Sequence, residues 1–354
     1  MQVHWRLFWY KLTHWEHWSF GAVYGPILWY YGWLALRARS FFFFSAANPD
    51  MENAGFVMES KYRIYQQLPV GTYPPTWLLQ PGPVNEQQPP WAEAIAKLGY
   101  PLIAKPDIGA RGRGVVLIKD ETMLRRYHAA MPVPYLLQQV IPYTEEVGIF
   151  YVRMPGQPQG RITGIVQKEM LHVTGDGIQT VAQLMAQHPR VRLYAQHLQL
   201  LPEQAGQVLP AGQVLQLSDV GNHARGARFI DASHRNNAQL EEVINKWALQ
   251  LPQFHYGRLD LRFKSWDDLY TGQHFMVVEL NGAGSEPTHM YDSRYRLWHA
   301  WRIIIQHWRW LYRISVLQHQ QGHAYMPHAE GRAMMQSVKK YDQLLGTFPI
   351  QDFS

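Results

Sequence analysis

The sequence of 354 residues contains no cysteine, which excludes disulfide bonds, thiolate metal sites and a cysteine nucleophile. It also lacks long runs of one charge sign, internal repeats and low-complexity tracts. Lysine and arginine total 33 against 27 aspartate and glutamate residues, a formal net charge of +6. Such a mild basic bias suits an anionic substrate, such as a nucleotide, or an anionic membrane surface, and does not by itself indicate nucleic acid. The length allows two or three compact units.

Aromatic side chains, in contrast, are abundant: 14 Trp and 20 Tyr, concentrated at the two ends of the chain. Residues 17–36 contain no Asp, Glu, Lys or Arg, and such a stretch is long enough to cross a bilayer as a helix. It is a poor spanning helix, because glycine, proline and aromatic residues that prefer the headgroup level interrupt it. Interfacial attachment through residues 1–44, or a re-entrant hairpin, is the first interpretation. A buried packing segment is the second, and a span or secretory signal the third.

The C-terminal portion predicts a long helix over residues 295–318. Apolar and aromatic residues recur there at steps of three or four, namely Trp298, Trp301, Ile305, Trp308 and Tyr312. Arginines lie off this stripe, so the helix could sit on an anionic membrane, but an aromatic stripe at this spacing more often packs in a core. Packing is the favoured interpretation, and the two aromatic ends could then pack on each other.

Between these ends, periodicity and turn residues predict an alternating α+β order. Strands are expected at 41–44, near 77–79, and at 101–105, 114–119, 135–140, 147–154 and 161–167. Helices are expected at 58–67, 91–98, 120–130 and 180–187.

A glycine-rich turn at residues 107–114 joins two of these strands directly after Lys105. Its glycines would let backbone N–H groups close on phosphate oxygens, and its arginines would add positive charge. The alternative is a flexible hairpin tip. Lys105 is the more telling residue, because a lysine that ends an apolar strand must be paired or must face a ligand. Lys168 ends a later strand in the same way.

Two further segments carry oxygen ligands and an arginine. Residues 257–260 read Gly-Arg-Leu-Asp, and residues 279–282 read Glu-Leu-Asn-Gly. On one hairpin, Asp260, Glu279 and Asn281 offer three hard oxygen ligands that can face one point, with Arg258 beside them, as in a site for magnesium on a nucleotide. The alternative is an ordinary hairpin with solvated carboxylates.

Other polar residues are less specific. Asp231 and His234 stand three residues apart without a third ligand at a suggestive distance, so a zinc site is not expected. Glu286 and His289 follow the second hairpin segment. The family that this chain resembles, named below, has the border of its acyl site at this place, so the resemblance implies that they contact a substrate near the metal. The alternative is that residues 286–288 cap a helix that begins near His289.

Taken in order, these residues resemble the ATP-grasp superfamily, in which two α+β subdomains grip ATP. The series comprises Lys61, Lys105, the glycine-rich turn, residues 138–141, Glu146, Lys168, Arg258, Asp260, Glu279 and Asn281. Its spacing is similar to that of the D-alanine:D-alanine ligase and cyanophycin synthetase branches. The resemblance covers roughly residues 59–292. It divides the chain into an aromatic N-terminal segment (1–58), a first subdomain (59–140), a second subdomain with the metal site (141–292) and a C-terminal amphipathic helix and tail (293–354).

The resemblance implies a role for each matching residue. Lys61 and Lys105 would contact ATP phosphates, and the loop with Gly109, Gly112 and Gly114 would close over them. Gln138, Gln139, Val140 and Ile141 would line the adenine, and Glu146 would hold the ribose. Lys168 and Arg258 would meet the phosphate or acyl phosphate, and Asn222 would approach the acyl site from residues 222–227. Asp260, Glu279 and Asn281 would bind two Mg²⁺ ions, for which Mn²⁺ could substitute.

The chain departs from the family pattern at two places. Gln138 stands where the family usually has glutamate, which weakens recognition of the base. D-alanine ligases also carry a substrate-binding domain before their first lysine, whereas 60 residues precede Lys61 here. The acceptor site is therefore expected to be absent or rebuilt, and D-alanine is in doubt as a substrate.

The resemblance implies an ATP-dependent carboxylate–amine ligase that works through an acyl phosphate. Its substrates would be a small carboxylate and a small amine, of amino acid or peptide type, and its place the cytoplasm, with the inner face of the membrane as an alternative. A phosphotransferase of the same fold and a catalytically silent nucleotide-binding protein at the membrane are the competing hypotheses.

Overall fold

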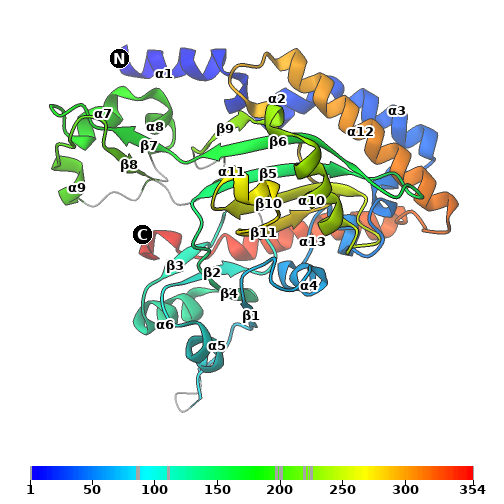
Figure 1. The fold of residues 1–354 in the computed structure, drawn as a ribbon, viewed down its shortest axis with the longest axis horizontal. Coiled ribbons are helices and arrows are strands. Elements are labelled where there is room, and N and C mark those ends of the chain that lie inside the picture. Colours follow the sequence, from blue (N-terminus) through cyan, green and yellow to red (C-terminus); the bar gives the residue numbers. More distant parts are fainter. Residues whose placement is uncertain are drawn as a thin grey trace.

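The computed structural model describes residues 2–84, 88–109, 112–195, 198, 202–217, 221, 223 and 226–353. The described chain forms antiparallel sheets of four, five and two strands, with orders β1-β4-β2-β3, β11-β10-β5-β6-β9 and β7-β8. In Figure 1 the five-stranded sheet crosses the middle of the molecule and the four-stranded sheet lies below it. Helices pack around both sheets, which confirms the predicted α+β class.

The four-stranded sheet consists of β1 (Thr76–Leu79), β2 (Leu102–Pro106), β3 (Val116–Ile118) and β4 (Tyr135–Gln139). It is accompanied by α5 (Ala92–Leu98) and α6 (Glu121–Ala130). The Asp120 carboxylate accepts a hydrogen bond from Met123 N and so caps α6. Trp91, Leu124, Tyr127 and Leu137 form the core beneath this sheet. The predicted helices and strands of this region are all present, with ends shifted by one or two residues.

The five-stranded sheet consists of β5 (Glu145–Val152), β6 (Arg161–Glu169), β9 (Arg228–Asp231), β10 (Tyr256–Phe263) and β11 (Phe275–Asn281). Helices α10 (Ala238–Ala248) and α11 (Trp266–Tyr270) are associated with it, and α4 (Lys61–Gln67) contacts β11. Alternate residues of β5 face opposite ways: Ile149 and Tyr151 join one core, and Phe150 and Val152 another. Both faces of this sheet are therefore covered.

A small unit is inserted between β6 and β9 (Figure 1, left). It contains β7 (His172–Thr174), α7 (Val181–Gln187), α8 (Pro189–Leu193), α9 (Pro202–Gly206) and β8 (Val214–Gln216). Thr180 begins α7 with a capping box, in which its hydroxyl and the Gln183 side chain each bond the other residue's backbone N–H. The unit has its own core, with Val173, Val181 and Leu217 among its members.

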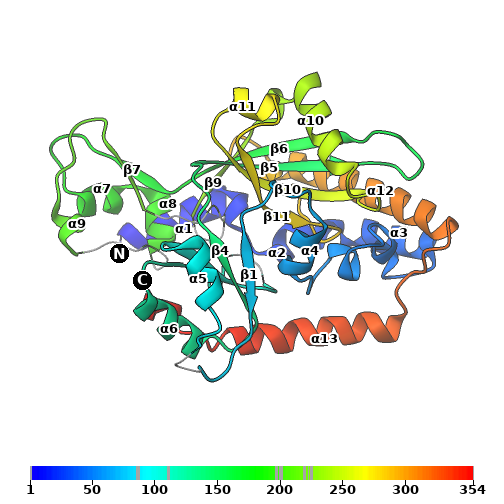
Figure 2. The ribbon, with the colours of Figure 1, turned by 60° about the horizontal axis from the view of Figure 1, so that its bottom comes forward.

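The two aromatic ends of the chain pack against each other. The N-terminal part forms α1 (Gln2–Thr13), α2 (Phe20–Tyr24) and α3 (Leu28–Ala38), with short 3-10 turns η1 (Trp15–His17) and η2 (Gly25–Ile27) between them. Helix α12 (Leu297–Gln320) lies beside α3 in Figures 1 and 2 and contacts it. The Trp301 indole donates a hydrogen bond to Val23 O at 2.8 Å. Packing of one aromatic end on the other, as the sequence suggested, is confirmed.

Several sequence-based expectations are wrong or incomplete. The strand expected at 41–44 is replaced by the 3-10 turn η3 (Phe43–Ala46), because Phe42, Phe43 and Phe44 are all buried and a turn can direct consecutive rings to different sides. The helix expected from residue 58 begins instead at Lys61. Met58 has a positive φ of 64°, which is not helical, and the Ser60 hydroxyl caps the helix by accepting a hydrogen bond from Arg63 N. Helix α13 (His328–Leu345) was not expected at all.

The apolar stretch of residues 17–36 is broken into separate short helices, and Pro26 lies in the turn η2 between two of them. Throughout the part of the chain that the structure describes, the helices are too short or too polar to span a bilayer.

Helix α13 returns the chain from the far end of α12 to the four-stranded sheet (Figure 2). Leu345, Phe348 and Phe353 enter the core of that sheet. The last turn, η9 (Ile350–Phe353), ends the described chain. These C-terminal residues therefore share a core with the sheet that carries Lys105, although the two are far apart in the sequence.

Candidate active site

The predicted hairpin exists and presents its polar residues on one face. In the β10–β11 ladder, Arg258 pairs with Asn281 and Asp260 pairs with Glu279. Directly opposed residues on antiparallel strands share a face, and so do residues two apart on one strand. All four side chains therefore lie together, as the sequence pattern required.

Asp260 is the centre of this face and is 3% exposed. The Arg258 guanidinium holds both of its oxygens, with Nε to Oδ1 at 2.9 Å and Nη2 to Oδ2 at 3.0 Å. Asn281 Nδ2 approaches Oδ2 at 3.4 Å, and the Lys168 ammonium lies 3.5 Å from Oδ1. Burial alone would raise the pKa of Asp260, but Arg258 and Lys168 hold it below its ordinary value. Asp260 is therefore ionised, and the positive charges of Arg258 and Lys168 balance its negative charge.

A glycine on the neighbouring strand makes room for this pair. Gly148 on β5 stands opposite Asp260 on β10. A Cβ atom at residue 148 would lie 2.8 Å from Asp260 Oδ1 and 3.2 Å from Arg258 Cδ. Any larger residue would displace the carboxylate or the guanidinium, so the site requires glycine at this position.

Lys168 connects Asp260 with a second buried carboxylate. Its Nζ donates to Glu146 Oε1 at 2.8 Å, and Arg262 Nε donates to Glu146 Oε2 at 3.2 Å. Burial would lower the pKa of Lys168, but Asp260 and Glu146 hold it above its ordinary value. The structure thus brings together Glu146, Lys168, Arg258 and Asp260 from three adjacent strands, together with Arg262, which the sequence analysis missed.

Lys105, at the end of β2, has neutral partners instead. Its Nζ donates to Tyr65 Oη and to Gln138 Oε1, both at 2.9 Å. Burial lowers the pKa of Lys105 to about 8. Gln138 in turn donates from Nε2 to Thr76 Oγ1 at 2.7 Å. In this structure Gln138 therefore orients Lys105, a role that the sequence analysis did not assign to it.

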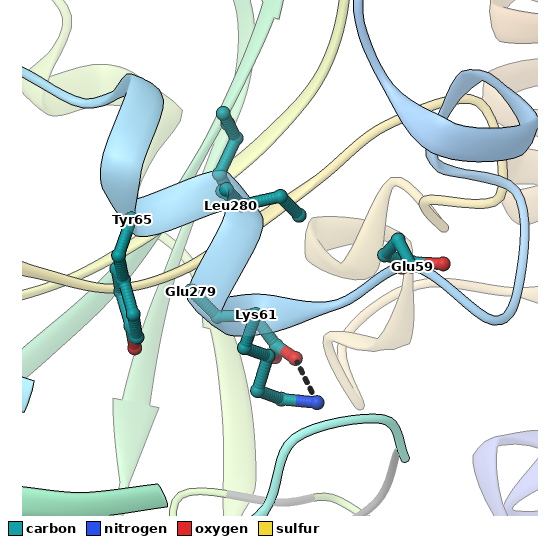
Figure 3. A pocket seen from close by; sticks show the side chains of 6 residues that line it. Glu59, Lys61, Tyr65, Glu279 and Leu280 are labelled. Carbon is teal, nitrogen blue, oxygen red and sulfur yellow. Dashed lines mark ion pairs between the residues drawn. The ribbon is translucent and has the colours of Figure 1, made fainter. Parts of the chain in front are cut away.

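Lys61 lies at the start of α4 between the two subdomains. Its Nζ donates to Gly109 O at 2.6 Å and lies 3.5 Å from Glu279 Oε1 (Figure 3, dashed). A small cavity of about 10 Å³, roughly the size of one water molecule, is lined by Glu59, Lys61, Ile64, Tyr65, Glu279 and Leu280. Lys61 thereby links Glu279, on β11 of the five-stranded sheet, to the glycine-rich turn that follows β2 of the four-stranded sheet.

The glycine-rich turn has the backbone that its sequence implies. Gly109, Gly112 and Gly114 have φ values of 143°, 68° and 71°, in the region that favours glycine. A Cβ on Gly114 would also lie 2.9 Å from Pro106 Cγ.

Helix α13 braces this turn from outside. Arg113 Nη1 donates to Asp342 Oδ1 at 2.9 Å, and Tyr341 Oη donates to Ile108 O at 2.8 Å. Nothing in the sequence linked the tail to this loop, because the two segments are more than two hundred residues apart.

The remaining predicted residues have mixed outcomes. In the segment expected to line adenine, Gln139 is exposed, Val140 half-buried and Ile141 buried. Asn222 lies outside the described residues. These positions keep their assigned roles as predictions.

The segment after β11 has two parts. Glu286 lies beside the site: its backbone O accepts from Arg258 Nη1 at 2.9 Å, and its carboxylate accepts from Tyr24 Oη at 2.7 Å. The short turn η8 (Thr288–Tyr291) follows, but its N-cap position is Pro287 and no side chain caps it. The capping interpretation is therefore wrong.

The sequence analysis missed Tyr65, Gly148 and Arg262. Two of these carried a usable signal: Tyr65 is four residues after Lys61 and so shares its helix face, and Arg262 is two residues after Asp260 and so shares its strand face. Gly148 carried none, because its importance depends on the side chain across the ladder. Zinc at Asp231 and His234 remains unsupported, since Asp231 accepts bonds from Ser233 N and Tyr295 Oη.

Comparison with known proteins gives structural similarity alone. No protein-family model matches the sequence, and no curated protein does. Among solved structures, the chain is similar to D-alanine–D-alanine ligase from Bacillus anthracis (TM-score 0.39, 15% identity, 74% of this chain and 69% of that one). It is also similar to VanG D-Ala:D-Ser ligase from Enterococcus faecalis (TM-score 0.42, 13% identity, 78% and 64%). A third is a bifunctional glutathione synthetase from Pasteurella multocida (TM-score 0.38, 15% identity, 74% and 36%).

The chain spans 36% of the glutathione synthetase and 64% of the D-Ala:D-Ser ligase. The functional proposal therefore rests on this chain's own residues.

Proposed function

We propose that the protein is an ATP-dependent carboxylate–amine ligase that forms an acyl phosphate. The observation that carries this proposal is the single strand face shared by Arg258, Asp260, Glu279 and Asn281. It combines oxygen ligands for a cation with a guanidinium for phosphate, and Lys168 stands 3.5 Å from its central carboxylate. This set of charges suits phosphoryl transfer, in which the protein acts by positioning groups and neutralising charge.

The donor set fits Mg²⁺. Asp260, Glu279 and Asn281 supply hard oxygens, which magnesium prefers, and no nitrogen or sulfur ligand is among them. We propose that these three residues hold one or two such ions, and that Mn²⁺ can substitute. When bound, the ions would neutralise charge on the nucleotide phosphates. Without nucleotide, Arg258 neutralises Asp260; with nucleotide, its charge would serve the phosphate.

The remaining residues would hold the nucleotide. Lys61 and Lys105 would contact the phosphates, under the loop of Gly109, Gly112 and Gly114. Residues 138–141 would border the adenine, and Glu146 the ribose. A carboxylate oxygen of the substrate attacks the γ-phosphorus, the bond to ADP breaks, and an acyl phosphate forms. An amine then attacks the acyl carbon, and inorganic phosphate leaves. Lys168 and Arg258, with Asn222 of the 222–227 segment, would stabilise the charge on the transferred group.

The acceptor side of the site would be rebuilt from the N-terminal segment. Tyr24 donates to Glu286 from α2, and the Trp15 indole donates to Tyr295 O at 2.7 Å from η1. Both contacts place this segment beside the residues that follow β11. We propose that it borders the substrates, which would be a small carboxylate and a small amine of amino acid or peptide type.

Glu279→Gln tests the ligase proposal. The variant should keep detectable nucleotide binding by calorimetry and should lose turnover by at least about 10³-fold, because a metal ligand becomes neutral. Glu242→Gln is the matched control and should retain full activity, because this carboxylate is exposed on α10 and pairs with Lys246. Full activity in Glu279→Gln would refute the proposal.

Product analysis separates ligase from phosphotransferase. A coupled screen for ADP release across amino acids, dipeptides and cell-wall precursors would find the substrates. Phosphate released when an amine is supplied, and not otherwise, identifies a ligase, whereas a stable phosphorylated product identifies a phosphotransferase. Binding of millimolar MgATP without ADP release from any substrate would favour the catalytically silent nucleotide-binding alternative, and no binding at all would favour a membrane scaffold.

We also propose that the protein works in the cytoplasm and contacts the inner face of the membrane through residues 1–44. In support, exposed aromatic and aliphatic side chains gather there: Trp5, Phe8, Trp9, Leu12, Trp18, Phe20, Leu28, Trp29, Trp33, Leu36 and Phe41. Tryptophan favours the headgroup level of a bilayer. Trp29→Ser combined with Trp33→Ser should reduce sedimentation with phosphatidylserine vesicles, and Leu249→Ser, at an exposed position just after α10, should not. Equal sedimentation of both variants would contradict the contact.

A further inference from the structure

A second cluster of potential metal ligands lies outside the proposed active site. Glu16 and His17, on the turn η1, meet His223 from the segment between β8 and β9. One ligand atom from each of the three residues lies within 4.8 Å of the others. Among the described residues, this is the one set of three or more histidine, aspartate or glutamate side chains whose ligand atoms lie that close together.

The atoms that face one another in this cluster lack hydrogen-bond partners among the described residues. They are Glu16 Oε2, His17 Nε2 and His223 Nε2, and each is buried. His17 Nε2 lies 3.4 Å from Glu16 Oε1, and His223 Nε2 lies 3.8 Å from Glu16 Oε2. Glu16 as a whole is 5% exposed. A buried carboxylate oxygen and two buried imidazole nitrogens without partners are costly, so an occupant that satisfies all three at once would stabilise the fold.

The surrounding contacts prepare these groups as ligands. His17 Nδ1 lies 3.0 Å from Tyr194 Oη, and if Nδ1 carries the proton in that contact, Nε2 is left with its lone pair toward the cluster.

We propose that Glu16, His17 and His223 form a zinc site, with two imidazole nitrogens and one carboxylate oxygen as ligands. Zinc takes this ligand set with bonds of about 2.0–2.2 Å, which places neighbouring ligand atoms about 3.3–3.5 Å apart. His223 Nε2 lies 3.8 Å from Glu16 Oε2, and one ligand atom from each of the three residues lies within 4.8 Å of the others, so small side-chain movements would bring the ligands to these separations. Three protein ligands leave a fourth position for water.

Arg190 sets the charge balance of this site. Its Nη1 donates to Glu16 Oε1 at 2.9 Å, and its Nε and Nη2 donate to Gly226 O and Ala227 O, both at 2.8 Å. Arg190 thus binds Oε1, which also lies 3.4 Å from His17 Nε2, and leaves Oε2 for the ion. Its positive charge lowers the affinity for a cation, so the site would bind zinc less tightly than a closed structural site.

The zinc would connect parts of the chain that are distant in sequence. It would join η1 of the N-terminal segment to His223, whose ring stacks on Tyr291 with centroids 5.0 Å apart. Tyr291 Oη in turn donates to Glu286. The site would therefore fix the N-terminal segment beside the residues that follow β11. This role is structural and does not depend on the ligase proposal.

Metal content is the first test. Untagged protein would be treated with a chelator, given one equivalent of zinc sulfate, passed through a desalting column and analysed by mass spectrometry for metals. Wild type should retain about one zinc per chain. His17→Gln and His223→Gln should each lose most of it, whereas His234→Gln, an exposed histidine on η7 (Ser233–Arg235), should retain it. Retention of less than about a tenth of an equivalent by wild type would overturn the proposal.

Thermal unfolding of wild type is the second test, and it holds even if the variants fail to fold. Zinc should raise the unfolding midpoint of chelator-treated protein by about 4 °C or more, while the same concentration of Mg²⁺ should not. An unchanged midpoint would overturn the proposal and would identify the cluster as an ion pair between Glu16 and Arg190 with two neutral histidines beside it. Equal zinc binding by His17→Gln, His223→Gln and wild type would overturn it as well.

Discussion

Lys105 and Lys168 end strands in two different sheets, and both ammonium groups are buried, yet their surroundings act on them in opposite directions. Lys105 bonds the neutral oxygens of Tyr65 and Gln138, and burial lowers its pKa to about 8. Lys168 lies between Glu146 and Asp260, which keep its pKa above the ordinary value in spite of burial. One lysine is poised for a ligand that will supply negative charge, and the other is already neutralised by the protein.

This difference predicts that one lysine mainly serves ligand binding and the other mainly stabilises the fold. A buried cation with neutral partners gains much from an incoming anion, because the anion supplies the missing charge. A buried cation held by two carboxylates contributes to the fold, and its removal leaves those carboxylates without their full complement of partners. We therefore expect nucleotide affinity to depend strongly on Lys105, and stability to depend strongly on Lys168.

Lys168→Met should have the largest effect. Removing one partner of a buried ion pair is strongly destabilising, and because Arg258 and Arg262 remain beside the carboxylates we expect a loss of about 3 kcal/mol in the free energy of unfolding. Urea denaturation followed by fluorescence would measure it. Lys246→Met on α10, whose pair with Glu242 is exposed, is the control and should unfold like wild type. A loss no larger than in this control would contradict the comparison.

Lys105→Met should act on binding instead. The free energy of unfolding should change by less than about 1 kcal/mol, because methionine fills a similar volume and the hydrogen-bond partners of the lost charge are neutral. Affinity for MgATP should fall by about 10- to 100-fold, the value of a charged hydrogen bond to phosphate. Calorimetric titration at pH 7 measures the affinity. If Lys105→Met unfolded as readily as Lys168→Met, the two lysines would not differ in the way described.

The pH dependence of nucleotide binding should follow Lys105. Its pKa in the folded protein is about 8, so the group is charged below pH 8 and loses its proton above it. Phosphate binds the charged form, and affinity should therefore be constant from pH 7 to about 8 and then fall by up to about tenfold per pH unit. Titrations between pH 7 and 9.5 would show the fall in wild type. The same profile in Lys105→Met would assign it to another group.

Gln138→Glu should give Lys105 a carboxylate partner, as Lys168 already has. We expect its effect on nucleotide binding to be the smallest of the series. The new carboxylate would lie at the position of Gln138 Oε1, 2.9 Å from Lys105 Nζ, and would raise the pKa of the lysine. Thr76 can accommodate the change, because its hydroxyl can donate as well as accept. The pH at which affinity begins to fall should rise by about one unit. An unshifted profile would show that Gln138 does not govern Lys105.

Much of the fold around the site was predictable from local patterns. The strands near 77–79, 101–105, 135–140 and 161–167 all exist, because alternation and bounding turn residues reflect forces within a few residues. The expected strand at 41–44 failed because four consecutive phenylalanines suit a buried strand and a buried turn equally well in composition. Helix α13 was missed because its role depends on contacts of Tyr341 and Asp342 with a loop far earlier in the chain.

The candidate site shows the same division. Cross-strand pairing of Asp260 with Glu279 follows from the hairpin, so these residues could be placed together from the sequence. The partners that determine their charge state could not. Arg262 reaches Glu146 on the adjacent strand β5, and Lys168 on β6 reaches Asp260 on β10 across the intervening strand β5, although these strands are separated in sequence. The meeting of Glu16, His17 and His223 had no sequence signal either, since two of these residues lie near the N-terminus and one lies far along the chain.

The sequence by itself determined which residues can carry charge and ligand oxygens at strand ends, since strand periodicity assigns each residue to a face. It therefore supplied Lys105, Lys168, Arg258, Asp260, Glu279 and Asn281 as a series. The tertiary structure alone decided which partner each of them meets. The energy of a buried charge depends on groups within a few ångströms, and for both lysines those groups come from other strands or helices. Two lysines with the same local pattern thus acquire opposite pKa shifts.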